Sequence, residues 1–398
     1  RSSPSALTET CSLTAAQTTG GTTACTFGSL ADGQWSVTVS QSSGSFVSLD
    51  SAALSLTIDT TAPTITIVSP STPNNATTLT YTVNSTETLI GLAAADFTVT
   101  GTSCAIGTLT GTSSPYSLTV TGCATATNVF VTLGANTSTD AAGNNAPTAA
   151  INTSSNTVVT DRTAPTVVGW TAGQATLTNA ATLTFSLSFS ESIVGLTTSD
   201  FTITGTSCVA SLDNASGANF TLTLSSCANT QNVTVLLKAS MVADLAGNTG
   251  PAAASATLTT TIDRTAPTIT SITTVTTSPT KATSITYTFT PSEALQTLTA
   301  ANFTAVGCTI TSVTAATGNT YTIVVGNCTD GATATLSARA GMLDLAGNAL
   351  AANFSSANMV IDYTAPTVIA WSTALASPTN ATSLTYTLTF SESITGVA

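Results

Sequence analysis

The chain has no histidine, and only 6% of its 398 residues are charged. Without histidine, mechanisms that depend on a Ser–His or Cys–His pair or on a histidine-ligated metal are excluded. A glycine loop of the phosphate-binding type is also missing. Paired carboxylates remain for glycosidase-like chemistry, but the acids recur with an internal repeat, and an enzyme rarely carries one active site per repeat. We therefore expect no enzyme.

Basic residues and long apolar runs are scarce as well. Lys and Arg number 6 against 18 Asp and Glu, which gives a net charge of −12 and leaves no basic patch for nucleic acid. No apolar run approaches the length of about 20 residues that a membrane-spanning helix needs. The N-terminal Arg1-Ser2-Ser3-Pro4 lacks an initiating Met and a signal-peptide core, so we expect a processed chain or a window of a longer one.

The residues that are present favour strands. Hydrophobic residues make up 42% of the chain although aromatic residues make up only 5%. Thr, Ser and Ala dominate the rest, and β-branched residues fit a pleated surface. A chain of this length is too long for one core, so the composition predicts an all-β protein of several domains with about 100 residues each.

The chain repeats itself. Similar linkers begin at Asp59 ("DTTAPT"), Asp161 and Asp263 ("DRTAPT") and Asp362 ("DYTAPT"), at spacings of 102, 102 and 99 residues. Such self-similarity indicates a tandem array. It divides the chain into a partial repeat of later strands (1–58), three whole repeats (59–160, 161–262 and 263–361) and a partial repeat of first strands (362–398).

Each whole repeat has the pattern of a β-sandwich. In 161–262 we expect seven short strands at about 165–170, 182–190, 200–205, 208–213, 219–225, 231–237 and 255–262, with period-two alternation such as "TLTFSLSFS". Seven antiparallel strands in about 100 residues are typical of an immunoglobulin-like sandwich. The fold class is therefore all-β, with tandem seven-stranded immunoglobulin-like sandwiches arranged as an elongated rod.

The linkers, together with "DAAGN" at 140–144 and "DLAGN" at 244–248 and 344–348, resemble bacterial immunoglobulin-like (Big-type) repeats of very large surface proteins and adhesins. In that family D-x-T-A-P joins consecutive domains and D-x-A-G-N precedes the last strand. The resemblance covers 59–398 well and 1–58 more loosely. It implies an extracellular protein of the bacterial cell surface that serves as a fibre, stalk or filament.

Most of the 18 acids recur at fixed places in the repeat. In a seven-strand sandwich the linker, the B–C turn and the F–G turn lie at one pole, so their carboxylates should converge and repel one another unless a cation binds. A hard cation with six to eight oxygen ligands fits, and calcium is our expectation, as the resemblance to calcium-stiffened arrays also implies. The predicted metal ligands are Asp59, Glu87, Asp96, Asp140, Asp161, Glu191, Asp200, Asp244, Asp263, Glu293, Asp344, Asp362 and Glu392.

A second interpretation of these acids needs no metal. Asp before "TAP" caps a turn by accepting a hydrogen bond from its own backbone, and "D-x-A-G-N" is good turn chemistry. In the third whole repeat Asn302 replaces the B–C acid, which weakens a four-carboxylate site there. Arg162 and Arg264 follow two linker Asp residues, and a bond to a neighbouring carboxylate would contribute little to stability because such pairs are exposed.

The eight cysteines fall two per repeat, at separations of 14, 19, 19 and 20 residues. This spacing predicts one local disulfide in each, which stabilises its domain by about 3 kcal/mol and places the chain in an oxidising, extracellular compartment. The alternative is a set of buried free thiols in a cytosolic protein. The predicted pairs are Cys11/Cys25, Cys104/Cys123, Cys208/Cys227 and Cys308/Cys328.

Three roles remain open for such a chain. We expect a structural shaft whose joints resist bending. The second is an adhesin module whose domains bind a glycan or protein ligand directly. The third is a filament formed by end-to-end or lateral self-association. The partial repeats 1–58 and 362–398 are explained either by a window that starts and stops within a repeat or by strand donation between chains.

Overall fold

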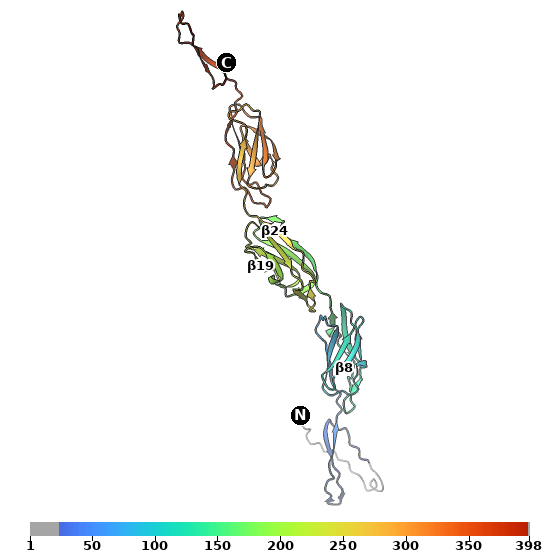
Figure 1. Ribbon diagram of the computed structural model, residues 1–398. Coiled ribbons are helices and arrows are strands. Elements are labelled where there is room, and N and C mark those ends of the chain that lie inside the picture. Colours follow the sequence, from blue (N-terminus) through green and yellow to red (C-terminus); the bar gives the residue numbers. More distant parts are fainter. Residues whose placement is uncertain (1–23, 397–398) are drawn as a thin grey trace.

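The computed structural model describes residues 24–396, and they form an all-β protein. Figure 1 shows the three whole repeats one after another along the chain, each built as its own pair of sheets. The helical segments are single 3-10 turns. Within the described residues, no helix is long and apolar enough to cross a membrane.

In 161–262 the two sheets have the strand arrangement of an immunoglobulin-like sandwich. The first sheet contains β15 (Val167–Ala172), β17 (Leu183–Val194), β20 (Ser216–Ser225) and β19 (Val209–Leu212) in that order, with β22 (Val242–Asp244) and β23 (Thr249–Gly250) added beyond β17. The second contains β18 (Phe201–Thr204), β21 (Gln231–Leu237), β24 (Leu258–Ile262) and β16 (Leu177–Thr178). First, second, fifth and fourth main strands form one sheet, and third, sixth and seventh form the other. The predicted all-β fold of immunoglobulin-like sandwiches is confirmed.

The repeat 59–160 is built in the same way. Its first sheet has the order β5 (Ile65–Val68), β6 (Thr78–Ser85), β9 (Tyr116–Thr121) and β8 (Ala105–Thr110). Its second sheet joins β7 (Phe97–Thr100), β10 (Thr127–Leu133), β13 (Ile151–Asn152) and β14 (Val158–Thr160). The short strands β11 (Ser138–Thr139) and β12 (Asn145–Ala146) pair with each other, and η2 (Ala94–Asp96) and η3 (Ser154–Asn156) are 3-10 turns.

The repeat 263–361 follows the same order. One sheet has β25 (Ile269–Thr274), β26 (Ser284–Pro291), β29 (Tyr321–Gly326) and β28 (Thr309–Ala315). The other has β27 (Phe303–Val306), β30 (Thr333–Ala338), β31 (Phe354–Ser355) and β32 (Met359–Val360). The matching 3-10 turns before the third main strand are η4 (Thr198–Asp200) and η5 (Ala300–Asn302).

Alternation along the strands explains why these segments form sandwiches. Every second side chain of β17 from Leu183 to Phe189 is buried, as the strand's period of two requires: Leu183, Phe185, Leu187 and Phe189 are at most 4% exposed. The residues between them are Thr and Ser that face outward. Three separate hydrophobic cores result, and each draws its residues from one repeat.

The segment between the first and second main strands of each whole repeat also meets the last strand. In 161–262, β16 pairs with β24 in parallel through Leu177 and Thr178. Single parallel bridges join Asn74 to Thr160 and Thr280 to Ile361 at the matching places. Backbone hydrogen bonds continue this contact into the linkers, from Asp161 N to Asn74 O (2.9 Å), Asp263 N to Thr178 O (3.0 Å) and Asp362 N to Thr280 O (2.9 Å).

The flanking segments are described only as strand pairs. Before Asp59, β1 (Gly33–Val37) pairs with β4 (Leu54–Ile58), and β2 (Ser42–Ser43) pairs with β3 (Phe46–Val47). After Asp362, β33 (Val368–Ser372) pairs with β34 (Thr387–Phe390). Tyr386 is 45% exposed, whereas Tyr81 and Tyr287 at the matching place in whole repeats are at most 1% exposed.

Each whole repeat contains one disulfide, with Cα–Cα distances of 4.0 to 4.1 Å: Cys104–Cys123, Cys208–Cys227 and Cys308–Cys328. In each repeat the first cysteine lies in the turn after the third main strand and the second follows the fifth. This turn and the loop after the fifth strand lie at the pole where the chain leaves the repeat. Cys11 lies outside the described residues, and so does its predicted pairing with Cys25.

Candidate functional site at the joints between repeats

The linker Asp forms a turn of its own at every joint. Its Oδ1 accepts a hydrogen bond from the backbone N–H two residues later, at 2.9 to 3.1 Å: Asp59 from Thr61, Asp161 from Thr163, Asp263 from Thr265 and Asp362 from Thr364. This is the Asx turn that short acidic side chains favour. The turn accounts for part of the recurrence of Asp.

The D-x-A-G-N loop holds the linker from the side of the following repeat. In 59–160, Asp140 Oδ1 accepts the backbone N–H groups of Ala142 and Asn144, each at 2.9 Å. Asn144 Nδ2 then donates both to Asp140 Oδ2 (2.8 Å) and to the backbone oxygen of Asp59 (3.0 Å). One amide group therefore bridges the loop and the linker.

The same bridge occurs in the next two repeats. Asn248 Nδ2 donates to Asp244 Oδ2 at 2.7 Å and to the Asp161 oxygen at 2.9 Å. Asn348 Nδ2 donates to Asp344 Oδ2 at 2.8 Å and to the Asp263 oxygen at 2.9 Å. The loop Asp residues are almost fully buried, with exposures of 1 to 3%, so these hydrogen bonds satisfy carboxylates that water barely reaches.

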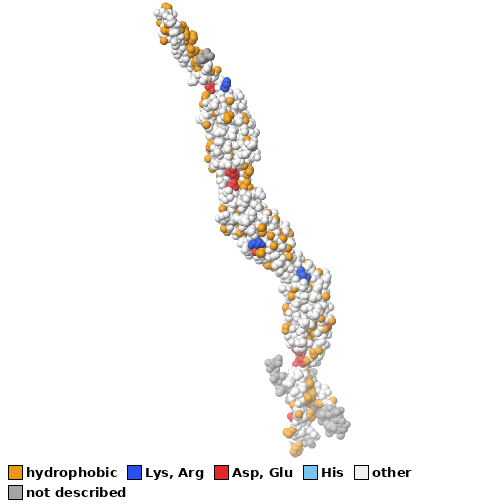
Figure 2. Space-filling model, viewed as in Figure 1, with side chains coloured by type: hydrophobic (Ala, Val, Ile, Leu, Met, Phe, Trp, Pro, Cys, Tyr) orange, Lys and Arg blue, Asp and Glu red, His pale blue; other side chains and the backbone are white. Residues whose placement is uncertain are grey.

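A glutamate completes a cluster of three carboxylates at each of these joints. The glutamate lies within the second main strand in 161–262 and just after that strand in the other two repeats. One oxygen from each of the three acids lies within 4.8 Å of the others. Figure 2 shows acidic patches at the junctions that precede 59–160 and 263–361. The three clusters are Asp59/Glu87/Asp140, Asp161/Glu191/Asp244 and Asp263/Glu293/Asp344.

Crowding of the acids changes their proton affinity. Burial, followed by the charges of the linker Asp and the loop Asp, raises the pKa of Glu87, Glu191 and Glu293. Burial alone would also raise the pKa of Asp140, but the hydrogen bonds from Asn144, Gly143 and Ala142 outweigh it and lower that pKa. At the last linker, burial and the neighbouring Asp362 raise the pKa of Glu392.

Four predicted ligands are not part of these three clusters: Asp362 and Glu392 at the last linker, and Asp96 and Asp200. Asp96 Oδ2 accepts the Ala93 N–H at 2.7 Å, and Asp200 Oδ2 accepts the Thr197 N–H at 2.7 Å, so both carboxylates cap the 3-10 turn before the third main strand. Asn302 makes the equivalent bond, since its Oδ1 accepts the Thr299 N–H at 2.8 Å. An amide oxygen is sufficient for this task, which explains why Asn replaces Asp in the third whole repeat.

The three-acid clusters fit a hard cation. Oxygens bound to one calcium ion at 2.3–2.6 Å lie at most about 5 Å apart, and the cluster oxygens satisfy this limit. The Oδ2 of each loop Asp accepts one hydrogen bond, from the Asn amide, and keeps a lone pair for an ion. Zinc and softer metals do not fit, because the donors are carboxylates, histidine is missing and the described repeats use their cysteines in disulfides.

The residue after the linker Asp is bound by the preceding segment. Its backbone N–H donates a hydrogen bond to a side chain in the loop before the sixth main strand; in the first segment this loop is the one before β1. The donor–acceptor pairs, at 2.6 to 3.0 Å, are Thr60 to Asp32, Arg162 to Thr125, Arg264 to Asn229 and Tyr363 to Asp330. Sequence analysis did not identify these loop acceptors. The Asp-Gly pairs at Asp32-Gly33 and Asp330-Gly331 were the available signal for two of them.

The linker arginines bind backbone oxygens of the preceding repeat and not a carboxylate. Arg162 donates from Nη1 to Cys123 O (2.9 Å) and from Nη2 to Ala76 O (2.7 Å). Arg264 donates from Nη1 to Cys227 O (2.8 Å) and from Nη2 to Ala180 O (2.7 Å). The guanidinium group thus joins the disulfide loop to the turn that precedes the second main strand.

The repeats also touch each other directly. Asn179, in the turn before β17, donates its backbone N–H to Ala346 O in the D-x-A-G-N loop of the next repeat at 3.2 Å. That loop therefore contacts the linker and the preceding repeat at once. Each joint between whole repeats is fixed by the preceding repeat, by the following repeat and by the turn of the linker itself.

Comparison with known proteins identifies the fold family of one repeat. Residues 161–261 match the family described as bacterial Ig-like domain, so this repeat is a bacterial Ig-like domain. A solved structure described as a marsupial T cell receptor matches at 11% identity, covering 74% of this chain and 99% of that chain, with a TM-score of 0.23, which is too low to support an argument. The curated proteins give no match.

Proposed function

We propose that this chain, which contains a bacterial Ig-like domain at 161–261, is the structural shaft of a long extracellular bacterial surface protein. The observation that supports a structural role is the joint: the same contacts recur at successive linkers, and a ligand-binding site would not require them. The disulfides support an extracellular location, because such bonds persist in oxidising compartments. The role is mechanical and not catalytic, and the rod holds its far end away from the cell.

The joint restrains bending because the linker is bound from both sides. At the second joint, the Asp161 oxygen is held by Asn248 of the following repeat, and the Arg162 N–H is held by Thr125 of the preceding one. Asp161 and Arg162 are neighbours in sequence. Rotation of one repeat against the other must therefore break hydrogen bonds or distort adjacent backbone dihedrals.

Calcium bound by the three acids would stiffen the joint further. A divalent cation supplies positive charge that removes the repulsion among the carboxylates. Asp161 belongs to the linker, Glu191 to β17 and Asp244 to β22. An ion held by all three connects the linker to the first sheet of the following repeat.

Small-angle X-ray scattering of the full chain tests the proposal. We expect the maximum dimension and the stiffness to fall when calcium is replaced by a chelator. The double substitution Asp161→Asn with Glu191→Gln should reproduce part of that loss in calcium, because one of the three acidic clusters is affected. Asp213→Asn, which changes an acid outside the joints, is the matched control. Superimposable curves with calcium and with chelator would refute calcium-stiffened joints.

A further inference from the structure

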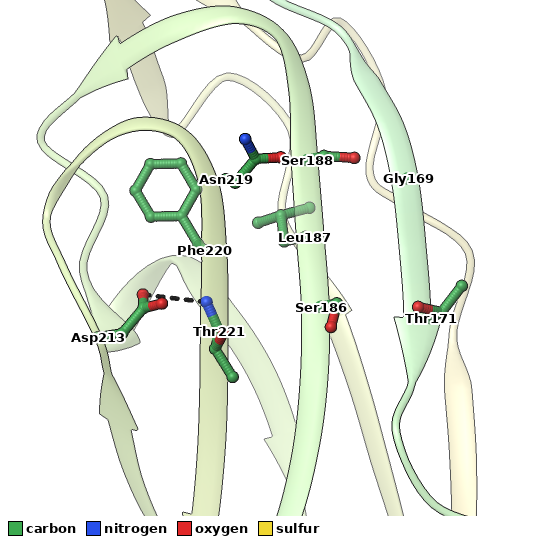
Figure 3. Close-up of a pocket in the computed structure, with 9 residues that line it drawn as sticks. All are labelled: Gly169, Thr171, Ser186, Leu187, Ser188, Asp213, Asn219, Phe220 and Thr221. Atoms are coloured by element: carbon green, nitrogen blue, oxygen red, sulfur yellow. Dashed lines mark hydrogen bonds between the residues drawn. The ribbon is translucent and has the colours of Figure 1, made fainter.

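The outer face of the first sheet in 161–262 contains a polar hollow of about 290 Å³. It crosses β15, β17 and β20, as Figure 3 shows, and lies away from the joints. Its lining is made of Gly169, Thr171, Ser186, Leu187, Ser188, Asp213, Asn219, Phe220 and Thr221. Leu187 and Phe220 point into the core and contribute backbone, so the exposed groups are hydroxyls, one amide and one carboxylate.

The hollow exists because residue 169 is a glycine. A Cβ at this position would collide with Ser188 Oγ, which occupies the space that a side chain would need. Gly169 is the fourth residue after the linker proline. The corresponding residue is Ile67 in the repeat 59–160 and Ser271 in the repeat 263–361. Ile67 packs against the core of its own repeat, and Ser271 carries a hydroxymethyl group that Gly169 lacks.

Other lining residues are also particular to this repeat. Asn219 is paired with Ser188 across the strands, and it directly precedes Phe220. Pro115 and Thr320 directly precede the matching Tyr116 and Tyr321 in the other repeats, so neither offers an amide. Asp213 follows β19 and is one of the few acids outside the repeating positions.

The polar groups of the hollow are available to a ligand. Asp213 Oδ1 accepts the Thr221 N–H at 3.0 Å, as drawn in Figure 3, which leaves Oδ2 open. Within residues 24–396, no hydrogen bond engages the side chains of Ser186, Ser188 or Asn219. Elsewhere on the sheets, outward Thr residues bond to each other, as Thr108 does with Thr119.

The arrangement of these groups selects the class of ligand. Neighbouring strands are about 4.8 Å apart, so groups on three strands extend over about 10 Å and cannot converge on one ion. The carboxylate and the net charge of −12 oppose an anion. No aromatic ring faces the hollow, which disfavours a flat apolar ligand. Hydroxyls both donate and accept, and Asp213 accepts, which matches a ligand rich in neutral hydroxyl groups.

We propose that this hollow is a binding site for a sugar residue of a neutral glycan, present in 161–262 and missing from the other two whole repeats. Ser186, Ser188 and Asn219 contact the hydroxyls along the ring, and Asp213 accepts from a pair of neighbouring hydroxyls. The site would add recognition to one repeat of the chain and is independent of the joints. A shallow polar site of this size should bind weakly, with Kd on the order of millimolar.

Saturation-transfer difference NMR on the full chain tests this, with the methyl glycosides of glucose, galactose and mannose as probes at millimolar concentration. We expect transfer to at least one glycoside from the unsubstituted chain. Asn219→Ala with Ser188→Ala should weaken binding about thirtyfold, because each of the two lost hydrogen bonds contributes about 1 kcal/mol. Gly169→Ser, which introduces the residue of the repeat 263–361, should abolish it.

The controls separate the hollow from the rest of the sheet. Thr223→Val changes an outward residue of β20 beyond the hollow and should leave transfer unchanged. Circular dichroism and the intact mass of the disulfide-bonded chain identify a variant that does not fold. Asp213→Asn removes the carboxylate of the site without a steric change and should also weaken transfer. Absence of transfer to all three glycosides, or equal transfer in the Thr223 and Asn219 variants, would overturn the proposal.

Discussion

At the scale of single residues, the asparagine of D-x-A-G-N is the most informative. Asn144, Asn248 and Asn348 each use one amide group to bond a buried carboxylate and a linker oxygen. An aspartate there would place a negative charge against both acceptors, and a shorter side chain would not span them. The residue therefore connects local turn chemistry with the contact between repeats.

Replacing this amide should weaken the joint. We expect Asn144→Ala to lower the free energy of unfolding of 59–160 by about 1–3 kcal/mol, because it leaves Asp140 Oδ2 buried with one partner fewer. The Ala142 to Asn144 amides should exchange hydrogen faster. Hydrogen exchange followed by mass spectrometry measures this. Asn128→Ala, at an exposed position of β10, is the control; equal exchange in both variants would contradict the bridge.

The glutamate of each cluster makes stability depend on pH. The pKa of Glu191 is raised in the folded chain, so the folded state binds more protons than the unfolded state between the ordinary value of 4.5 and the raised one. Stability is therefore lost as the pH rises through this window. In chelator, we expect Glu191→Gln to raise the Tm at neutral pH, with no effect below pH 4.5.

Calcium should reverse the sign of that effect. With the ion bound, Glu191 is a ligand, and its replacement by Gln should lower the Tm at neutral pH. Calorimetry of both variants in calcium and in chelator gives the comparison. If Glu191→Gln raises the Tm equally in both solutions, the three acids do not bind calcium.

At the scale of elements, the sequence predicted the main strands because period-two alternation and burial coincide. The strand expected at 182–190 is β17 (Leu183–Val194), and the one expected at 231–237 is β21 (Gln231–Leu237). The short β16, β22 and β23 were not predicted, because two or three residues carry no measurable periodicity. Their pairing is decided by tertiary contacts.

The candidate site was predictable only in part. Convergence of the linker Asp, the Glu and the F–G Asp follows from the topology of a sandwich. The 3-10 turn that directs Asp96 and Asp200 to their own backbone was not visible, since three residues carry no helical pattern. The partners of Arg162 and Arg264 are backbone oxygens, which every residue has, so residue types do not reveal them.

The disulfide should influence the joint as well as its own repeat. Cys227 O accepts a hydrogen bond from the Arg264 guanidinium, so the loop closed by Cys208–Cys227 also binds the linker. We expect Cys208→Ala with Cys227→Ala to cost about 3 kcal/mol of stability, because the loop closed by the bond is 19 residues long. Thermal unfolding measures this cost.

The same pair of substitutions should speed hydrogen exchange in residues 227–230 and 263–265. Arg339→Lys, in a repeat whose disulfide is intact, is the control for a general loss of stability. If exchange at the linker does not change while the Tm falls, the disulfide stabilises its repeat without acting on the joint.

At the scale of the whole molecule, the linker residue after Asp should set the bend at each joint. Arg264→Lys removes the planar group that bonds Cys227 O and Ala180 O together, and lysine cannot reproduce it. We expect a wider distribution of angles between 161–262 and 263–361 in negative-stain electron micrographs, with the preceding joint unchanged. Equal widening at both joints would indicate a general loss of folding.

Lateral association is also proposed at this scale. No charged residue occurs from Phe97 to Thr139, so the sides of the repeat 59–160 offer little electrostatic resistance to a second chain. Sedimentation velocity should then show larger species as the concentration of the chain rises. A single monomeric boundary at all concentrations would exclude side-by-side packing.

The parallel contact between β16, which follows the first main strand, and the last strand β24 determines how the repeat 161–262 responds to tension. A pull on the two ends of 161–262 acts on β16 and β24, which run side by side in the same direction. Their hydrogen bonds, and the bond from Asp263 N to Thr178 O, are then loaded together in shear and are not opened one at a time. Every whole repeat has such a contact, so a chain stretched by flowing liquid would hold its length up to a threshold force and lengthen one domain at a time above it.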